Sequence, residues 1–337
     1  MSNAKALFRL SVAAAISALA LTAQTQPAAK TSQAADRSCW LRDVASPSDA
    51  KVYALCEQGT VWVTDDGGQK WSSRDLGTNF TLRAFAFLDN SQGLAVGDGG
   101  TILATEDGAK TWTARKSGTT EKLLDVAFVG NSGWASGYNG VIVHSGDGGR
   151  TWTAQSTGTT QTLEAIFFLD EQHGWATGWA GTILKTTDGG AHWSMIKTDA
   201  ASWSLSSIYF KDANTGWIVG FEGQILHSTD GGATWKLQAS PTKNWLTSIT
   251  FDTRGRGWIT HDEGFLRSDD GGQTWKLVNT DSRYFLSRLV RVKDRVWALG
   301  QASLLRENAD GSKWVRIDSL VTDRSIIYTQ PDTESPK

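Results

Sequence analysis

The octet SGDGGRTW, residues 145–152, decides the fold, because versions of it recur through the whole chain. The other copies are TDDGGQKW ending at Trp71, TEDGAKTW at Trp112, TTDGGAHW at Trp193, STDGGATW at Trp235, SDDGGQTW at Trp275 and a divergent ENADGSKW at Trp314. Successive closing tryptophans stand 39 to 42 residues apart. Self-similarity with a period of about 40 residues is typical of propeller blades and related repeat arrays.

Each repeat has room for four short strands, because it is poor in helix-forming runs and carries glycine at fixed offsets. The first strand begins at Leu41, Leu82, Leu123, Leu163, Leu205, Leu246 and Leu286 in the seven units. The second strand carries Trp134, Trp175, Trp217 and Trp258, or Tyr53, Leu94 and Trp297 in the equivalent place. A glycine-centred turn leads into the third strand, and the octet turns the third strand into the fourth. The sequence therefore predicts an all-β, seven-bladed β-propeller of four-stranded antiparallel blades.

The octet itself is predicted to be a structural turn. Its aspartates can accept hydrogen bonds from the amides of the turn, and the glycine that follows tolerates a left-handed conformation. These aspartates are Asp66, Asp107, Asp147, Asp188, Asp230 and Asp270. The closing tryptophans, Trp71, Trp112, Trp152, Trp193, Trp235, Trp275 and Trp314, are expected to cover neighbouring strands. The octet lacks the alternating acid spacing of an EF-hand, so we expect no calcium site.

The ends of the chain differ in composition from the repeats. Residues 1–23 contain Lys5 and Arg9 before an apolar run, which predicts a secretory signal peptide. Residues 24–37 are predicted to be a disordered linker, 38–330 the propeller and 331–337 a disordered tail. We therefore expect export to the periplasm or beyond, without a stable membrane anchor. After removal of the signal the chain has 31 basic and 35 acidic residues, a balance that argues against nucleic-acid binding.

The two cysteines fall in the first unit. Cys39 precedes the first strand and Cys56 follows the second. The antiparallel pairing of these strands through the turn around Pro47 is expected to make the two positions neighbours. In an exported protein this geometry favours a disulfide. The alternative is that they are two unrelated small residues.

The octets have the form of the Asp-box, or BNR, repeat. The units LDVAFVGNSGWASGYNGVIVHSGDGGRTW (residues 124–152) and LEAIFFLDEQHGWATGWAGTILKTTDGG (residues 163–190) resemble the photosystem II stability and assembly factor family. The resemblance covers nearly the whole chain after the signal peptide. It implies a seven-bladed propeller that acts as an assembly chaperone and holds a newly made membrane-protein subunit on the lumenal or periplasmic side. The lumen applies if the host is photosynthetic.

Members of this family have an arginine cluster on one face, and the chain offers candidates for it. Arg42 and Arg83 directly follow the leading leucine of the first strand in their units. Arg288 lies one place later in its unit, and Arg283 is nearby. Units seven, one and two become neighbours when the ring closes. These arginines are predicted to form a basic patch at the mouth of the channel, suited to carboxylates of a partner. The alternative is that they are scattered surface arginines, some of them paired with Asp43 or another nearby acid.

A second candidate surface is aromatic. The loops that enter the first strands and the turns between second and third strands are expected on one face of the ring. They carry Phe80, Tyr138, Trp179, Trp203, Phe221, Trp245 and Tyr284. Large aromatic side chains on one face suit a binding rim for peptide or sugar. The alternative is that each ring is a lid on its own blade.

No enzyme motif stands out. The units vary little, a pair of glycosidase carboxylates apart from the octets is not found, and the five histidines lack ligand spacing. We therefore predict a non-catalytic, monomeric scaffold without cofactor or metal. It is expected to bind a protein partner, such as a membrane-protein subunit or its exported segment. The competing interpretation is a carbohydrate-binding or sialidase-like Asp-box protein. The sequence does not decide which strands complete the ring, because the segment Ser325–Tyr328 falls where another first strand would begin.

Overall fold

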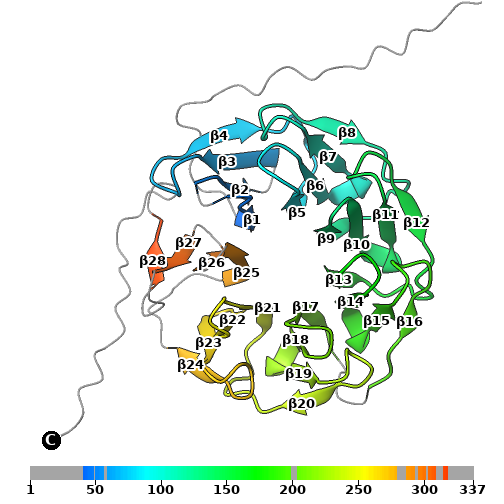
Figure 1. Ribbon diagram of the computed structural model, residues 1–337, viewed down its shortest axis with the longest axis vertical. Coiled ribbons are helices and arrows are strands. Elements are labelled where there is room, and N and C mark those ends of the chain that lie inside the picture. Colours follow the sequence, from blue (N-terminus) through cyan, green and yellow to red (C-terminus); the bar gives the residue numbers. More distant parts are fainter. Residues whose placement is uncertain are drawn as a thin grey trace, which may run out of the picture.

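Seven four-stranded antiparallel sheets stand in a ring (Figure 1) within the residues that the structure describes. The structure is a computed structural model, and it describes residues 41–48, 50–56, 59–198, 203–278, 286–292, 295–300, 303–308 and 314–317. In every sheet the strands follow one another in sequence order, from the first at the centre of the ring to the fourth at its edge. The predicted seven-bladed all-β propeller is confirmed.

The first four blades have the following bounds. Blade 1 contains β1 (Leu41–Ala45), β2 (Val52–Cys56), β3 (Thr60–Thr64) and β4 (Ser72–Asp75). Blade 2 contains β5 (Leu82–Phe87), β6 (Gly93–Gly97), the 3₁₀ turn η2 (Asp98–Gly100), β7 (Ile102–Thr105) and β8 (Thr113–Arg115). Blade 3 contains β9 (Leu123–Val129), β10 (Ser132–Gly137), η3 (Tyr138–Gly140), β11 (Ile142–Ser145) and β12 (Thr153–Gln155). Blade 4 contains β13 (Leu163–Phe168), β14 (Gly174–Gly178), η4 (Trp179–Gly181), β15 (Ile183–Thr186) and β16 (Ser194–Met195).

The other three blades repeat the plan. Blade 5 contains β17 (Leu205–Phe210), β18 (Gly216–Gly220), η5 (Phe221–Gly223), β19 (Ile225–Ser228) and β20 (Lys236–Gln238). Blade 6 contains β21 (Leu246–Phe251), β22 (Gly257–His261), β23 (Gly264–Ser268) and β24 (Lys276–Val278). Blade 7 contains β25 (Leu286–Val292), β26 (Arg295–Gly300), β27 (Ser303–Glu307) and β28 (Trp314–Arg316).

The hydrophobic core is divided among the junctions between blades. The buried apolar side chains form clusters, and each cluster draws on two neighbouring blades, the pair formed by blades 7 and 1 included. The second-strand tryptophans cross these junctions, as when Trp175 Nε1 donates to the carbonyl of Gly231 in the next octet at 3.2 Å. Trp134 and Trp217 make the equivalent bonds to Gly189 and Gly272. Burial of aromatic surface between sheets is thus the main force that holds the ring.

Each octet of blades 1 to 6 forms a turn closed by its aspartate. In blade 3, Asp147 Oδ1 accepts the amides of Arg150 and Thr151 at 2.9 Å each, and the hydroxyl of Ser145 accepts the amide of Gly149 at 2.8 Å. The two glycines of this turn have φ values of 73° and 83°, which few other residues adopt without strain. The octet turn also bonds to the turn between the first two strands, because Gly148 donates its amide to the carbonyl of Asn131.

Among the described residues, no blade is shared by the first and last units of the chain. The four strands of blade 1 and the four strands of blade 7 each come from one continuous segment. Trp297 of blade 7 packs in one cluster with Leu41 and Val44 of blade 1, and Arg306 Nη1 donates to the carbonyl of Gly67 at 2.8 Å. The segment Ser325–Tyr328 and the predicted signal peptide, linker and tail lie outside the described residues. Among the described residues, no helix has the length and apolar character needed to cross a membrane.

Candidate functional site: the rim of the ring

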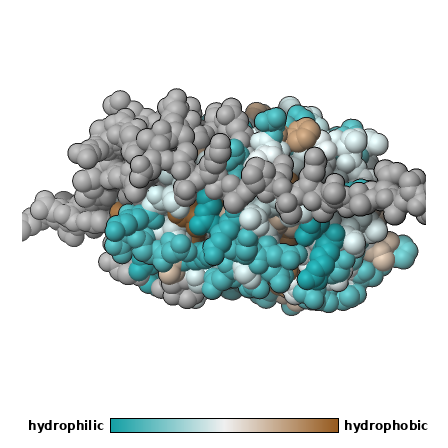
Figure 2. All heavy atoms as spheres, turned by 90° about the horizontal axis from the view of Figure 1, so that it is seen from above, coloured by the Kyte–Doolittle hydropathy of each residue, from teal (hydrophilic) through white to brown (hydrophobic). Residues whose placement is uncertain are grey.

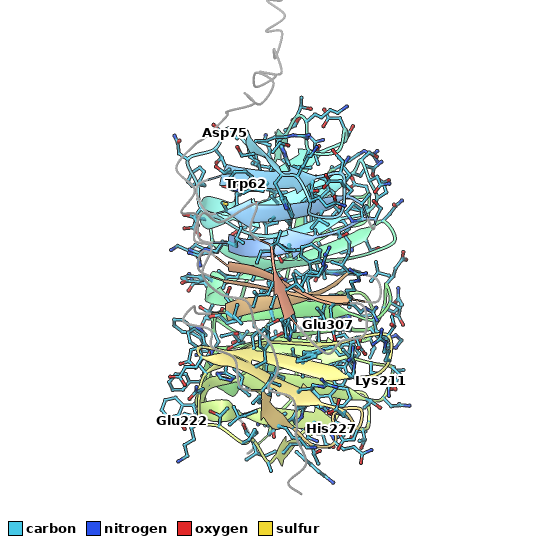
Figure 3. All side chains as sticks on the ribbon, turned by 90° about the vertical axis from the view of Figure 1, so that its left-hand side faces the viewer. Trp62, Asp75, Lys211, Glu222, His227 and Glu307 are labelled. Carbon is cyan, nitrogen blue, oxygen red and sulfur yellow. The ribbon has the colours of Figure 1, made fainter. Side chains whose placement is uncertain are left out.

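Two kinds of connection emerge on one face of the ring, which we call the rim face. They are the turns between second and third strands and the loops that lead from one blade to the next. The amide of Gly181 in η4 donates to the carbonyl of Trp203 at 2.8 Å, which joins a connection of each kind. Figure 3 shows Glu222 of η5 on this face and Lys211, from the turn between β17 and β18, on the opposite face. The octet turns lie on the side of Lys211, because they bond to turns of its kind.

A β-bulge at the start of every first strand supplies part of the rim. Pairing between first and second strands shifts by one residue directly after the leading leucine, for example between Leu82 and Ala84 and between Leu163 and Ala165. The extra residue is Arg83 in blade 2 and Glu164 in blade 4. Bulges re-aim side chains at the edges of sheets. The position from which the sequence predicts a basic patch is therefore a bulge position.

Four charged residues lie together at blades 1 to 3, and we call them the charged corner: Arg42, Arg83, Asp98 and Lys122. Arg83 holds Asp98 through two hydrogen bonds, Nε to Oδ1 at 2.7 Å and Nη2 to Oδ2 at 3.3 Å. Lys122 Nζ approaches Asp98 Oδ2 to 3.8 Å. Although partial burial acts in the other direction, Arg83, Lys122 and Arg42 keep the pKa of Asp98 below its ordinary value. The predicted arginines Arg42 and Arg83 thus share an internal acid.

Arg288 is bound to carboxylates of the chain itself. Its Nε lies 2.9 Å from Asp43 Oδ1 and its Nη2 lies 2.8 Å from Asp125 Oδ1, so one guanidinium joins blades 7, 1 and 3. Both carboxylates are almost fully buried. The side chain of Arg288 is still 32% exposed, and the role in partner binding that the sequence predicts for it stays a prediction. Arg283, predicted to join the same patch, lies outside the described residues.

Four of the residues that stand two places after the leading leucines bond to the first strand of the next blade. Asp43 Oδ2 accepts the amide of Phe85 at 2.9 Å, and Asp125 Oδ2 accepts the amide of Ile166 at 3.0 Å. Ser207 and Ser248 accept amides of the following blades in the same way. Burial raises the pKa of Asp43 to about 6, although Arg288 acts to lower it. The sequence carried this signal, since the seven positions read Asp43, Ala84, Asp125, Ala165, Ser207, Ser248 and Arg288.

Aromatic side chains continue the rim from blade 3 to blade 6, and we call this stretch the aromatic arc: Tyr138, Trp179, Trp203, Phe221 and Trp245. The last four are exposed over 41% to 48% of their surface. Ring centroids are 6.4 Å apart for Tyr138 and Trp179, 6.0 Å for Trp203 and Phe221, and 6.4 Å for Phe221 and Trp245. The sequence prediction that these residues share one face is consistent with these contacts.

Two indoles of the arc are fixed by hydrogen bonds along their edges. Trp179 Nε1 donates to Glu164 Oε1 at 2.5 Å, and Trp245 Nε1 donates to Ser206 Oγ at 2.7 Å. Burial raises the pKa of Glu164, against the effect of this hydrogen bond and of Arg83. Because both rings are held and still exposed, they are preorganised for contact with another molecule.

The remaining aromatic positions differ. Phe80 is 53% exposed and lies against Gly99 of its own blade, where an added Cβ would stand 3.1 Å from the Phe80 ring. It therefore resembles the lid on a blade that the sequence left as an alternative. Tyr284 lies outside the described residues.

The cysteine prediction is only partly visible. Cys56 is fully buried in β2 and takes part in a disulfide. Cys39 lies outside the described residues, so the pairing stays a prediction.

The described residues contain no cluster of three or more His, Cys, Asp or Glu side chains that could hold a metal ion. Three exposed acids at the rim were not singled out from the sequence: Glu222, Asp262 and Glu263. They could have been found by reading the residues that follow the second strands as one column of the repeat. Glu164 stands in another column, that of Arg42 and Arg83 near the start of the first strands. Visible parts of the ring's edge are largely hydrophilic (Figure 2).

Comparison with known proteins agrees with the repeat pattern and with the fold. The model of the photosynthesis system II assembly factor YCF48 family matches residues 69–158 and 150–240, which together make up half of the chain. The chain belongs to this family. The BNR/Asp-box repeat model matches residues 266–277. A search of curated proteins finds no match.

Solved structures share the propeller fold at low sequence identity. YCF48 bound to D1 peptide is 23% identical, with a TM-score of 0.61 over 74% of this chain and 84% of that one. YCF48 from Cyanidioschyzon merolae is 19% identical, with a TM-score of 0.68 over 83% and 98%. An ancestral GH74 enzyme is 15% identical, with a TM-score of 0.67 over 86% of this chain and 48% of that one. At these identities the likeness concerns the fold alone.

Proposed function

We propose that this chain is an exported, non-catalytic propeller that binds an exported segment of a membrane protein and assists assembly of a membrane-protein complex. The observation that carries the proposal is the aromatic arc, in which four large rings on one face stay exposed although two are fixed by hydrogen bonds. Aromatic residues of this kind dominate the energetics of protein interfaces.

Family membership supports a role of the photosystem II assembly type. The related YCF48 structure contains a bound D1 peptide. A rim of exposed aromatic side chains suits a peptide partner. The predicted signal peptide supports export, which would place the rim beside the lumenal or periplasmic segments of membrane proteins. In this proposal the protein is a monomer and its partner is a polypeptide.

Photo-crosslinking in the native host tests the proposal. A photoreactive phenylalanine analogue is placed at Trp203 on the rim face or, as the matched control, at Lys211 on the opposite face (Figure 3). We expect the Trp203 position to crosslink to a membrane-protein subunit and the Lys211 position to give no such product. Equal products from both faces, or none from Trp203, would contradict the proposal.

The carbohydrate alternative is checked with the same purified protein. Exposed tryptophans can stack on sugar rings as well as on peptides, so a glycan array and a panel of chromogenic glycosides are informative. We expect neither binding nor turnover. Selective glycan binding that Trp203→Ala abolishes would replace the protein partner with a carbohydrate.

A further inference from the structure

The charged corner contains an internal example of how this rim holds a cation. Lys122 Nζ lies 3.8 Å from the carboxylate of Asp98 and 5.2 Å from the ring centroid of Tyr138. The ammonium therefore interacts with an acid from one 3₁₀ turn, η2, and with an aromatic ring from the next, η3. A cation over an aromatic face, close to a carboxylate, is attracted by both.

Blades 4 and 5 repeat the aromatic ring of this arrangement without the lysine. Trp179 and Phe221 open η4 and η5 as Tyr138 opens η3. At the position of Lys122, directly before the first strand, these blades have Thr162 and Ser204. Among the described residues, no cation lies over the ring of Trp179, Trp203 or Phe221.

Carboxylates accompany these aromatic rings. Glu222 is exposed and directly follows Phe221, whose ring contacts those of Trp203 and Trp245. Asn244, the residue before Trp245, donates its Nδ2 to Glu263 Oε2 at 3.0 Å, so a second exposed acid is held next to the loop that carries Trp245. Lys243 is the exposed base in the same loop.

We propose that the aromatic arc at blades 5 and 6 binds an arginine or lysine side chain of a polypeptide, flanked by apolar residues. The cation lies between the Glu222 carboxylate and the rings of Trp203, Phe221 and Trp245, as Lys122 lies between Asp98 and Tyr138. The apolar neighbours cover the exposed parts of these rings. This inference rests on the proposed function and names the chemistry of its partner.

Fluorescence anisotropy with short labelled peptides tests the inference. The probe is acetyl-Gly-Ser-Leu-Arg-Leu-Ser-Gly-amide, and the comparison peptides have norleucine or glutamate in place of arginine. We expect the arginine peptide to bind about fivefold to tenfold more tightly than the norleucine peptide, the range of a cation–π contact assisted by a carboxylate. The glutamate peptide should bind most weakly.

Variants distinguish specific binding of the arginine peptide at this site from nonspecific binding. Glu222→Gln should reduce the preference for arginine to about twofold or less, and Glu171→Gln, an exposed acid on the opposite face, should leave it unchanged. Ser204→Lys places the internal cation of blade 3 in blade 5 and should compete with the peptide, whereas Ser204→Met controls for size. Thermal melting of each variant confirms that it is folded.

The outcomes distinguish this inference from the function on which it rests. Equal affinity for the arginine and norleucine peptides, together with loss of both in Trp203→Ala, overturns the cation site and leaves the peptide-binding rim. An unchanged preference in both Glu222→Gln and Ser204→Lys also overturns the cation site. Absence of binding to every peptide up to about 1 mM, a free energy near −4 kcal/mol, contradicts both.

Discussion

At the scale of single residues, the Asp-box turn is a local network with few parts. The carboxylate of Asp147 accepts two backbone amides and the hydroxyls of Ser145 and Thr151, the latter at 2.6 Å. The hydrogen bonds from Thr151, through its hydroxyl first and its amide second, lower the pKa of Asp147 to about 2. Each such bond satisfies a polar group that the tight turn would otherwise leave without a partner.

Substitution of this aspartate should destabilise the protein. We expect Asp147→Ala to lose about 1 to 2 kcal/mol of unfolding free energy, by analogy with the loss of a side-chain cap. Urea denaturation at pH 7 measures the difference, with Glu171→Ala as an exposed-acid control of unchanged stability.

The same substitution has a predictable pH dependence. The pKa is lowered on folding, from 3.8 to about 2, so the stabilisation is present above pH 4 and is lost as the pH falls through 2. The difference between the native protein and Asp147→Ala should therefore shrink in acid. A difference that is constant from pH 7 to pH 2 would show that charge at Asp147 has no part in it.

At the scale of strands and blades, the indoles of the second strands fasten each blade to the next. Trp175 is 1% exposed, and its Nε1 reaches the carbonyl of Gly231 one blade further on. The sequence predicted the strand and the blade of this residue from the period alone. It could not predict the bond to Gly231, because that contact spans 56 residues and depends on how two sheets pack.

Replacement of this indole by phenylalanine isolates the contact between blades. We expect Trp175→Phe to lower the unfolding free energy by about 1 to 2 kcal/mol, from the lost hydrogen bond and the smaller ring. Trp203→Phe is the matched control, because that ring is half exposed on the rim. If both variants melt at the same temperature as the native protein, the bond between blades adds nothing to stability.

At the scale of the whole molecule, the inner strands meet around one charged triad. The carboxylates of Asp43 and Asp125 are buried, whereas the side chain of Arg288 is 32% exposed, and together they join three blades beside the junction of blades 7 and 1. Arg288 stands one place after the column of Arg42 and Arg83, in the column of Asp43 and Asp125. The sequence prediction grouped Arg288 with the arginines and left pairing with Asp43 or another nearby acid as the alternative, and the structure shows this pairing. The contact with Asp125 could not be predicted, because it joins residues 163 positions apart and depends on the closed ring.

Because of the triad, we expect the free energy of unfolding to depend on pH between about 5 and 7. Asp43 has a pKa of about 6 in the folded protein and an ordinary value of 3.8, so the folded state binds a proton that the unfolded state lacks between these limits. Its contribution to stability is therefore largest in acid and is lost as the pH rises through 6. We expect the native protein to gain about 1 kcal/mol from this group between pH 7 and pH 5, and Asp43→Asn to lack this gain.

Denaturant unfolding of both proteins at the two pH values measures this effect. Asp65→Asn, an exposed acid in the first octet, should keep the native pH dependence. Identical pH dependence in the native protein and in Asp43→Asn would mean that the buried carboxyl keeps an ordinary pKa.

The two faces of the ring carry different kinds of turn. Octet turns and the turns that bond to them occupy one side, whereas the 3₁₀ turns and the arc occupy the other. Heritable change in the turns of one side can therefore alter what the molecule recognises while the wedges beneath stay as they are. A protein engineer could likewise transplant η5 and its neighbouring loop into a second blade, which would give a propeller with two copies of the proposed binding site and an unchanged core.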